Sequence, residues 1–160
     1  QNAASKQRVV GEIEKGIKEG AKLRLDGRKL NLVGDVPETC FLNPSVFENV
    51  HHEMTCAQEE IFGPVASVLR AKNLDEALEL ISRCPYGNAA SIFTTNGKWA
   101  RQFRHEVVAG NVGINIGIVA PMSFFPFGGR RDSFFGVLHG QGRDVIRFFT
   151  DPQIIIERWF

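Results

Sequence analysis

The chain has 160 residues, of which 43% are hydrophobic and 23% are charged, a composition typical of one globular domain with a sizeable core. Its formal net charge is only +1 and the basic residues alternate with acidic ones, so nothing indicates binding to nucleic acid or to an anionic membrane. No apolar run approaches transmembrane length and residues 1–6 do not resemble a signal peptide, which predicts an intracellular protein, cytoplasmic or, in a eukaryote, in the mitochondrial matrix.

The cysteines and histidines indicate neither a disulfide framework nor a metal site. Cys40, Cys56 and Cys84 are an odd number without Cys-x-x-Cys spacing, which fits a reducing compartment. His51 and His52 are adjacent, so their side chains point in different directions, and no third ligand has metal-like spacing. We expect surface histidines, small buried or half-buried thiols and no metal.

The first fifty residues predict one helix and several short strands. Ser5 is a candidate N-cap, and Val9, Ile13 and other apolar residues then recur at helical spacing until Gly20. Residues 22–25 and 30–33 flank Asp26-Gly27, which favours a hairpin or short ladder. Residues 41–50, interrupted by a proline, predict a short extended segment or edge strand.

The middle of the chain alternates between strands and helices. Strands are predicted over 65–71, 89–94 and 111–116. Helices are predicted after Asn73, which has Glu76 three residues on as in a capping box, and after Asn96-Gly97. This order implies an α/β fold, a largely parallel sheet flanked by helices, with right-handed crossovers. Sites in such sheets lie beyond the carboxyl ends of the strands.

The last third contains a long connection and a very apolar end. Residues 116–129 are rich in Gly, Pro and Phe with little periodicity, and such loops are often functional, so they are a candidate substrate wall. A short helix is expected over 142–149. Residues 153–159 contain three consecutive isoleucines and predict a strand covered on both faces.

The segment from Glu59 to Pro64 is the most informative motif, because a carboxylate pair and an aromatic residue precede a Gly-Pro turn and an apolar strand. An ionised Glu60 offers oxygens suited to the hydroxyls of a ribose. Phe62 could supply a flat wall for a heteroaromatic ring. The alternative is that Glu59 and Glu60 are solvated loop charges and Phe62 is an ordinary core residue.

Further motifs accompany this segment along nearly the whole chain. They are Gly20-Ala21-Lys22, Asp26-Gly27-Arg28, Asn43-Pro44-Ser45-Val46, Met54-Thr55-Cys56, Pro85-Tyr86-Gly87-Asn88-Ala89-Ala90, Phe93-Thr94-Thr95-Asn96, Gly110-Asn111-Val112-Gly113-Ile114-Asn115 and Pro126-Phe127-Gly128-Gly129. In this order they resemble the C-terminal part of the aldehyde dehydrogenase catalytic domain. The family oxidises aldehydes with NAD(P).

The tail narrows the resemblance to one branch of that family. Arg131, then Ser133-Phe134-Phe135-Gly136, Leu138-His139-Gly140-Gln141-Gly142 and the end at Arg158-Trp159 are similar to the methylmalonate-semialdehyde dehydrogenase branch, which is coenzyme A-acylating. Common aldehyde dehydrogenases carry a Lys, a Ser-Gly pair and a Gly-Arg-Glu segment after the Phe-Gly-Gly turn. These departures leave the details of the substrate pocket open.

The resemblance implies roles for four residues and an arrangement of the chain. Glu60 would bind the nicotinamide ribose of NAD and Phe62 would border its ring. Phe127 would border the aldehyde pocket, and Asn115 would steady the loop near it. Residues 1–150 would belong to the catalytic domain, and residues 151–160 would form an oligomerisation strand of a homodimer or homotetramer.

Two parts of the expected chemistry are missing. The family's nucleophilic Cys lies upstream of the Glu59 motif, in a segment absent here, and none of the three cysteines replaces it. The Gly-x-Gly-x-x-Gly fingerprint is also absent, so most of the NAD site would lie upstream, as the start without Met also suggests. We therefore expect an inactive fragment of the acylating enzyme; the alternative is a catalytically dead binding or assembly module of the same fold.

Overall fold

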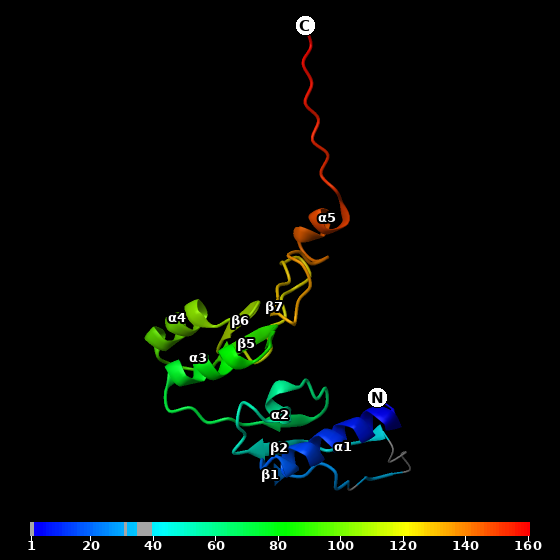
Figure 1. Cartoon of the computed structure of the whole chain (residues 1–160), viewed down its shortest axis with the longest axis vertical. Helices are drawn as coiled ribbons and strands as arrows, with labels where there is room; N and C mark the ends of the chain where they lie inside the picture. The colour runs from blue at the N-terminus through cyan, green and yellow to red at the C-terminus, as the bar shows by residue number, and fades with distance from the viewer. Residues whose placement is uncertain (1, 31, 35–39) are drawn as a thin grey trace. The chain divides into compact units, whose positions relative to one another are not determined.

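The computed structural model describes residues 2–30, 32–34 and 40–160, and the chain divides into two compact units, Gln1–Cys84 and Pro85–Phe160 (Figure 1). Both units combine helices with short strands, in agreement with the predicted α/β class. None of the helices in the described residues is both long and apolar enough to cross a membrane.

The first unit places a helix on a three-stranded sheet. Its elements are α1 (Ala3–Lys18), β1 (Lys22–Leu25), β2 (Ser45–Glu48), α2 (Thr55–Gln58), β3 (Val65–Ser67) and α3 (Leu74–Arg83). The strand order is β1-β2-β3; β1 pairs antiparallel with β2, and β3 pairs parallel with it. Strand β2 is therefore central: the extended segment predicted within 41–50 is confirmed, and the alternative that it lies at an edge was wrong.

The second unit contains one parallel and one antiparallel pair of strands. Its elements are β4 (Tyr86–Gly87), β5 (Ala89–Ile92), α4 (Gly97–Glu106), β6 (Asn111–Ile114), β7 (Arg130–Arg131) and α5 (Asp144–Phe149). Strands β5 and β6, which α4 connects in sequence, pair directly with each other in parallel, as predicted. Strand β4 pairs antiparallel with β7. The strand β3 belongs to a different sheet from β5, so the predicted succession of strands does not form one sheet.

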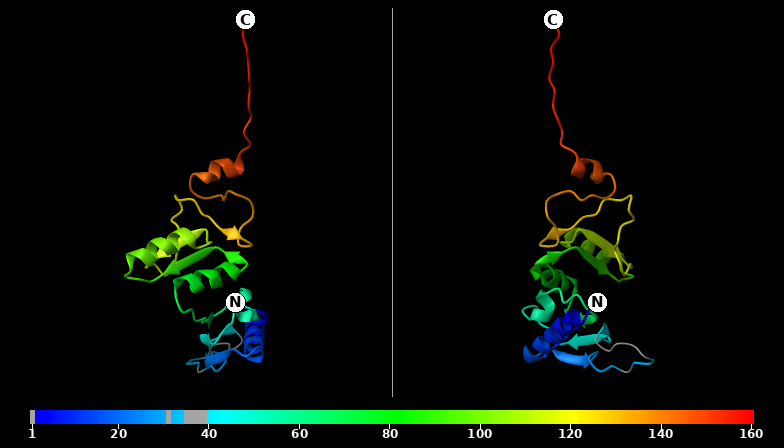
Figure 2. Two further views of the ribbon diagram at one scale, coloured as in Figure 1. Left: turned by 60° about the vertical axis from the view of Figure 1, so that its left-hand side comes forward. Right: turned by 90° about the vertical axis from the view of Figure 1, so that its right-hand side faces the viewer.

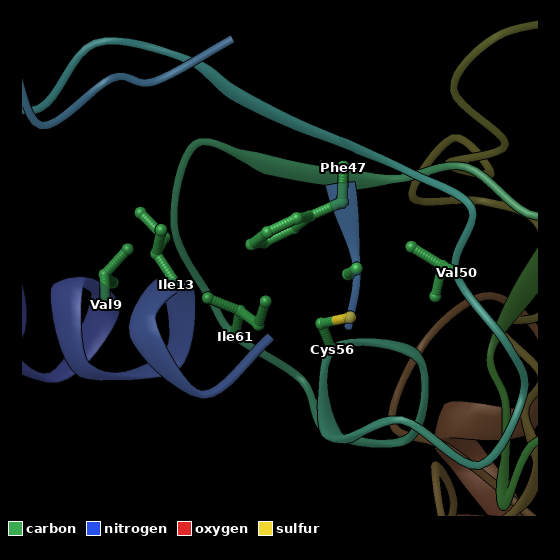
Figure 3. Packing of buried hydrophobic residues seen from close by; sticks show 7 residues of the cluster. Val9, Ile13, Phe47, Val50, Cys56 and Ile61 are labelled. Atoms are coloured by element: carbon green, nitrogen blue, oxygen red, sulfur yellow. The ribbon is translucent and has the colours of Figure 1, made fainter. Parts of the chain in front are cut away.

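Helix α1 packs its apolar stripe onto β2 (Figures 2 and 3). Val9 and Ile13 are almost fully buried and share a core with Phe47 of β2 and Ile61. Each such side chain contributes roughly 1.5–3 kcal/mol when fully buried. The predicted stripe of Val9, Val10, Ile13 and Ile17 is confirmed for Val9 and Ile13, whereas Val10 is only partly buried and Ile17 is 40% exposed.

The caps of two helices can be compared with their predictions. Asn2, and not Ser5, caps α1: its Oδ1 accepts a hydrogen bond from the Ser5 amide at 2.9 Å. The prediction failed because Ser5 lies inside the first turn, where its amide needs the cap. The capping of α3 by Asn73 is confirmed, since its Oδ1 accepts from the Glu76 amide at 2.9 Å.

The hairpin predicted around Asp26-Gly27 is absent, because described residues 30, 32 and 33 form no strand and β1 pairs with β2. The turn instead packs on the start of β2. The Gly27 amide donates to Ser45 Oγ at 2.9 Å and the Gly27 carbonyl accepts from the Asn43 amide at 2.9 Å. A Cβ at Gly27 would lie 1.8 Å from the Asn43 carbonyl oxygen, so only glycine fits.

The C-terminal segment leads away from α5 without forming a strand (Figure 1). Ile154, Ile155 and Ile156 are 86%, 68% and 91% exposed. The strand predicted over 153–159 is thus not formed within the single chain, and its coverage by a second copy stays a prediction.

Replacing Asp26 should expose a pH-dependent contribution to stability. Arg28 Nε and Nη2 each donate to the Asp26 carboxylate at 2.8 Å, and chiefly these bonds lower its pKa to about 2. Because the unfolded carboxyl titrates near ~3.9, the bridge contributes fully above that pH and loses its contribution as the pH falls toward 2. We expect Asp26→Asn to lower the free energy of unfolding by about 1 kcal/mol at pH 7 and progressively less at lower pH.

Urea unfolding from pH 7 to pH 3 measures this difference. Glu48→Gln is the matched control, since its partner Arg24 is exposed and 3.5 Å away. A difference between parent and Asp26→Asn that does not change with pH would contradict the assignment.

Candidate functional site

The backbone of the Glu59–Pro64 segment turns alternate side chains in opposite directions. Ile61 is buried in the core of the first unit, whereas its neighbours Glu60 and Phe62 are exposed, Phe62 by 70%. Phe62 has a φ of +54°, a conformation that is uncommon for a bulky residue. The alternative that Phe62 is an ordinary core residue is therefore wrong. An exposed carboxylate and an exposed aromatic ring flank one buried anchor.

Three contacts fix this segment to the rest of the first unit. The Ser45 amide donates to the Pro64 carbonyl at 2.8 Å, where β2 and β3 begin their parallel pairing. Arg8 Nη2 of α1 donates to the Ile61 carbonyl at 2.5 Å. A Cβ at Gly63 would lie 2.7 Å from Val9 Cγ2, so the glycine lets the segment lie directly on the helix.

A cavity of about 480 Å³ lies beside the aromatic ring. It is lined by Lys6, Cys40, Leu42, Phe62, Gly63 and Pro64. Its volume falls in the range of small-molecule sites, and its mainly apolar wall suits a flat ring. Phe62 thus borders a concave surface as well as solvent.

Glu59 and Glu60 differ in their surroundings although both are exposed. The pKa of the exposed Lys15 ammonium on α1 is raised, chiefly by its hydrogen bond to Glu12 and to a smaller extent by the charges of Glu59 and Glu19. Glu59 therefore interacts with the helix. Glu60 forms no ion pair with the residues that the structure describes and faces solvent, the arrangement that a ligand-binding carboxylate needs.

The loop that carries Phe127 is held against β6 in the second unit. Asn111 Nδ2 donates to the Gly128 carbonyl at 2.7 Å and to the Asn88 carbonyl at 3.1 Å. Phe127 is half-buried, and its ring meets the His139 ring edge-on at 5.3 Å between centroids. His139 also contacts Phe134 at 4.6 Å.

Asn115 joins the carboxyl ends of two parallel strands. Its Oδ1 accepts from the Thr94 amide at 2.8 Å, and its Nδ2 donates to the Thr94 carbonyl at 3.0 Å. Its own amide donates to the Ile92 carbonyl at 2.8 Å. The side-chain amide thus stabilises the β5–β6 edge from which the 116–129 loop departs.

Sequence reasoning missed the residues that position these elements. Arg8 and Asn111 act through hydrogen bonds to distant carbonyls, and no local pattern indicates such bonds. Gln141 is a third case: its Nε2 lies 3.4, 3.2 and 3.3 Å from the carbonyl oxygens of Pro121, Met122 and Phe125. It stabilises the predicted 116–129 loop, which carries no strand or helix.

The environment of Cys56 does not suit an activated nucleophile. All three are free thiols. Cys56 is buried in the core, and burial raises the pKa of its thiol, which disfavours the reactive thiolate. In the described ranges, His, Cys, Asp and Glu nowhere gather in a group of three or more that could hold a metal ion.

The site and fold agree with one family. The model of the aldehyde dehydrogenase family matches residues 1–155. The chain belongs to this family, and the resemblance inferred from its motifs is confirmed.

Individual relatives point to the semialdehyde branch. The chain is 50% identical over 154 residues to malonate-semialdehyde dehydrogenase 1 of Geobacillus kaustophilus and 49% identical over 154 residues to malonate-semialdehyde dehydrogenase of Halalkalibacterium halodurans. Each alignment covers 96% of this chain and 31% of the relative. The chain therefore spans about a third of the length of the relatives it matches.

Solved structures show the same relation. The chain matches a crystal structure from Sinorhizobium meliloti, assigned as methylmalonate-semialdehyde dehydrogenase and complexed with NAD, with a TM-score of 0.90 and 40% identity, over 98% of this chain and 32% of that one. It matches methylmalonate-semialdehyde dehydrogenase from Oceanimonas doudoroffii with a TM-score of 0.88 and 37% identity, over 99% and 32%.

Adding one methyl group at Gly110 should displace the Phe127 loop. A Cβ there would lie 2.4 Å from backbone atoms of Gly128 and Gly129, which cannot move as a flexible side chain could. We expect Gly110→Ala to lower the free energy of unfolding by about 1–3 kcal/mol. Gly11→Ala is the control: no atom lies within 4 Å of its Cβ, and helix propensity favours alanine. Thermal unfolding distinguishes the two, and equal effects would contradict the packing described.

Proposed function

We propose that this chain is part of an NAD-dependent, coenzyme A-acylating semialdehyde dehydrogenase that acts on methylmalonate semialdehyde or a close analogue. The exposure of Glu60 and Phe62 on either side of the buried Ile61 carries the proposal, because it presents an acceptor and a flat ring side by side. Bound NAD supplies the hydride acceptor of the reaction. The crystal structure from Sinorhizobium meliloti was obtained with NAD, which supports this cofactor.

Each of the four predicted residues has a task in this proposal. The Glu60 carboxylate accepts hydrogen bonds from the nicotinamide ribose hydroxyls, and the Phe62 ring limits the position of the nicotinamide. Phe127 excludes water from one side of the aldehyde site. Asn115 keeps the loop at the end of β6 in place, which its two bonds to Thr94 support.

The nucleophile belongs to a segment outside this chain. An upstream thiolate would add to the aldehyde carbonyl, and transfer of hydride to NAD would leave an acyl group bound to that sulfur as a thioester; the coenzyme A thiol would then take the acyl group and release the enzyme thiol. The buried Cys56 with its raised pKa fits a packing role. The 160 residues alone should therefore show no NAD reduction with an aldehyde.

We also propose a cytoplasmic location for the whole enzyme.

The charge of Glu60 should matter more than that of Glu59. In the full-length enzyme Glu60→Gln keeps the size and removes the charged acceptor, and bonds to charged groups contribute about 1.5–3 kcal/mol. We expect NAD affinity or hydride transfer to fall roughly tenfold or more. Fluorescence titration with NAD and single-turnover kinetics measure both quantities.

Glu59→Gln is the matched control, because Glu59 is the adjacent residue and is also exposed to solvent. It should leave NAD binding nearly unchanged. Equal losses in both variants would contradict the assigned roles, and a full-length protein without NAD binding at millimolar concentration would instead indicate a catalytically dead binding or assembly module.

We also propose that residues 151–160 pair with a second copy of the enzyme. The three exposed isoleucines and the 88% exposed Trp159 form an apolar segment that would aggregate if it stayed uncovered. Deleting residues 153–160 from the full-length protein should reduce the mass measured by light scattering to that of smaller species. An unchanged oligomer would remove this segment from the interface.

A further inference from the structure

The cofactor segment, residues 59–64, has a backbone that its own sequence does not stabilise. Helix α2 ends at Gln58, and Phe62 then adopts its φ of +54° without the freedom of glycine. Residues held in such regions persist when the surrounding structure over-determines them. The bond from the Ser45 amide to the Pro64 carbonyl holds the end of the segment, and the contacts that hold its earlier part come from α1 and the residue after it.

The first contact fixes the peptide plane that leads into Phe62. Arg8 Nη2 donates to the Ile61 carbonyl at 2.5 Å, a bond between residues 53 positions apart. A charged donor makes a stronger hydrogen bond than a neutral one. Because the Ile61 carbonyl and the Phe62 amide share one peptide plane, holding this oxygen restricts the φ of Phe62 and the direction of its ring.

The second contact fixes the start of the same stretch. The N-cap residue of α2, Met54, makes no side-chain cap bond. Glu19, which follows α1, replaces it: its carboxylate accepts from the Thr55 amide at 2.7 Å and from the Thr55 hydroxyl. The Glu59 amide in turn donates to the Thr55 carbonyl at 2.9 Å. Thr55 therefore connects Glu19 to Glu59, the first residue of the cofactor segment, through these hydrogen bonds.

We propose that Arg8, on α1, and Glu19, the residue directly after α1, are positioning residues that aim Glu60 and Phe62 at the nicotinamide half of the cofactor. The inference rests on the proposed function. Two residues beyond Ile61, Gly63 lies directly on Val9, since a Cβ at Gly63 would be 2.7 Å from Val9 Cγ2, and this packing keeps the stretch against the helix. Neither residue touches the cofactor in this account; each acts through the backbone.

The test uses Arg8→Ala in the full-length enzyme and compares two ligands. NAD affinity should fall roughly tenfold, the loss expected for one charge-assisted bond. Affinity for ADP, which lacks the nicotinamide riboside, should not change. Arg8→Lys keeps a charged donor and should recover part of the NAD affinity. Arg24→Ala, an exposed arginine 3.5 Å from its partner Glu48, is the matched control and should bind both ligands normally.

A double-mutant cycle distinguishes positioning from general stability. If Arg8 acts through Glu60 and Phe62, the Arg8→Ala, Glu60→Gln double variant should lose less NAD affinity than the product of the single losses. Glu19→Gln provides an independent variant if Arg8→Ala does not fold, with the same selective loss of NAD affinity expected.

Three results would overturn the inference: equal losses of NAD and ADP affinity, multiplicative effects in the cycle, or a lowered melting temperature without selective loss of NAD. In each of these the parent enzyme still binds NAD, so the proposed function stands. Failure of the parent to bind NAD removes the proposed function and this inference together.

Discussion

The close packing of α1 on the central strand of the first unit is the constraint on which the candidate cofactor site depends. A Cβ at Gly16 would lie 3.0 Å from the Phe47 ring, and one at Gly63 would lie 2.7 Å from Val9. Gly16 therefore allows the close approach of α1 to β2, and Gly63 allows the close approach of the segment to α1. Because Ile61 is buried in the same core, its neighbours Glu60 and Phe62 must point outward. The burial of Ile61 thus leaves the Glu60 carboxylate and the Phe62 ring exposed, where both can contact a ligand.

In the second unit, close packing on a glycine and hydrogen bonds to backbone carbonyls also position a candidate site loop. The Phe127 loop lies on Gly110 because that position has no side chain, and Asn111 binds the Gly128 carbonyl. Asn115 closes the adjoining edge of the parallel pair. Side-chain amides at the start of β6 and directly after it therefore stabilise the loop and the edge from which it departs, which explains how a segment rich in glycine and phenylalanine can present a defined ring.

The sequence predicted the periodic elements well and the irregular ones poorly. The apolar stripe of α1, the Asn73 cap and the β5–α4–β6 succession depend on local patterns, and the structure shows them. The hairpin at Asp26-Gly27 failed because Gly27 fits against Asn43 of a later segment, a contact that no local pattern encodes. The motif indicated Glu60 and Phe62. It did not indicate Arg8 and Glu19, because their hydrogen bonds are to Ile61 and Thr55, 53 and 36 residues away in sequence. The strand predicted for the apolar C-terminal segment is not formed within the single chain.

The proposed recognition of a ribose diol by Glu60, beside Phe62, is tested most directly by a structure of the full-length enzyme with NAD. We expect Glu60 carboxylate oxygens within hydrogen-bond distance of the nicotinamide ribose hydroxyls, with the Phe62 ring beside the nicotinamide and the Arg8 bond to Ile61 retained. A complex in which NAD is bound while Glu60 faces only solvent would contradict it.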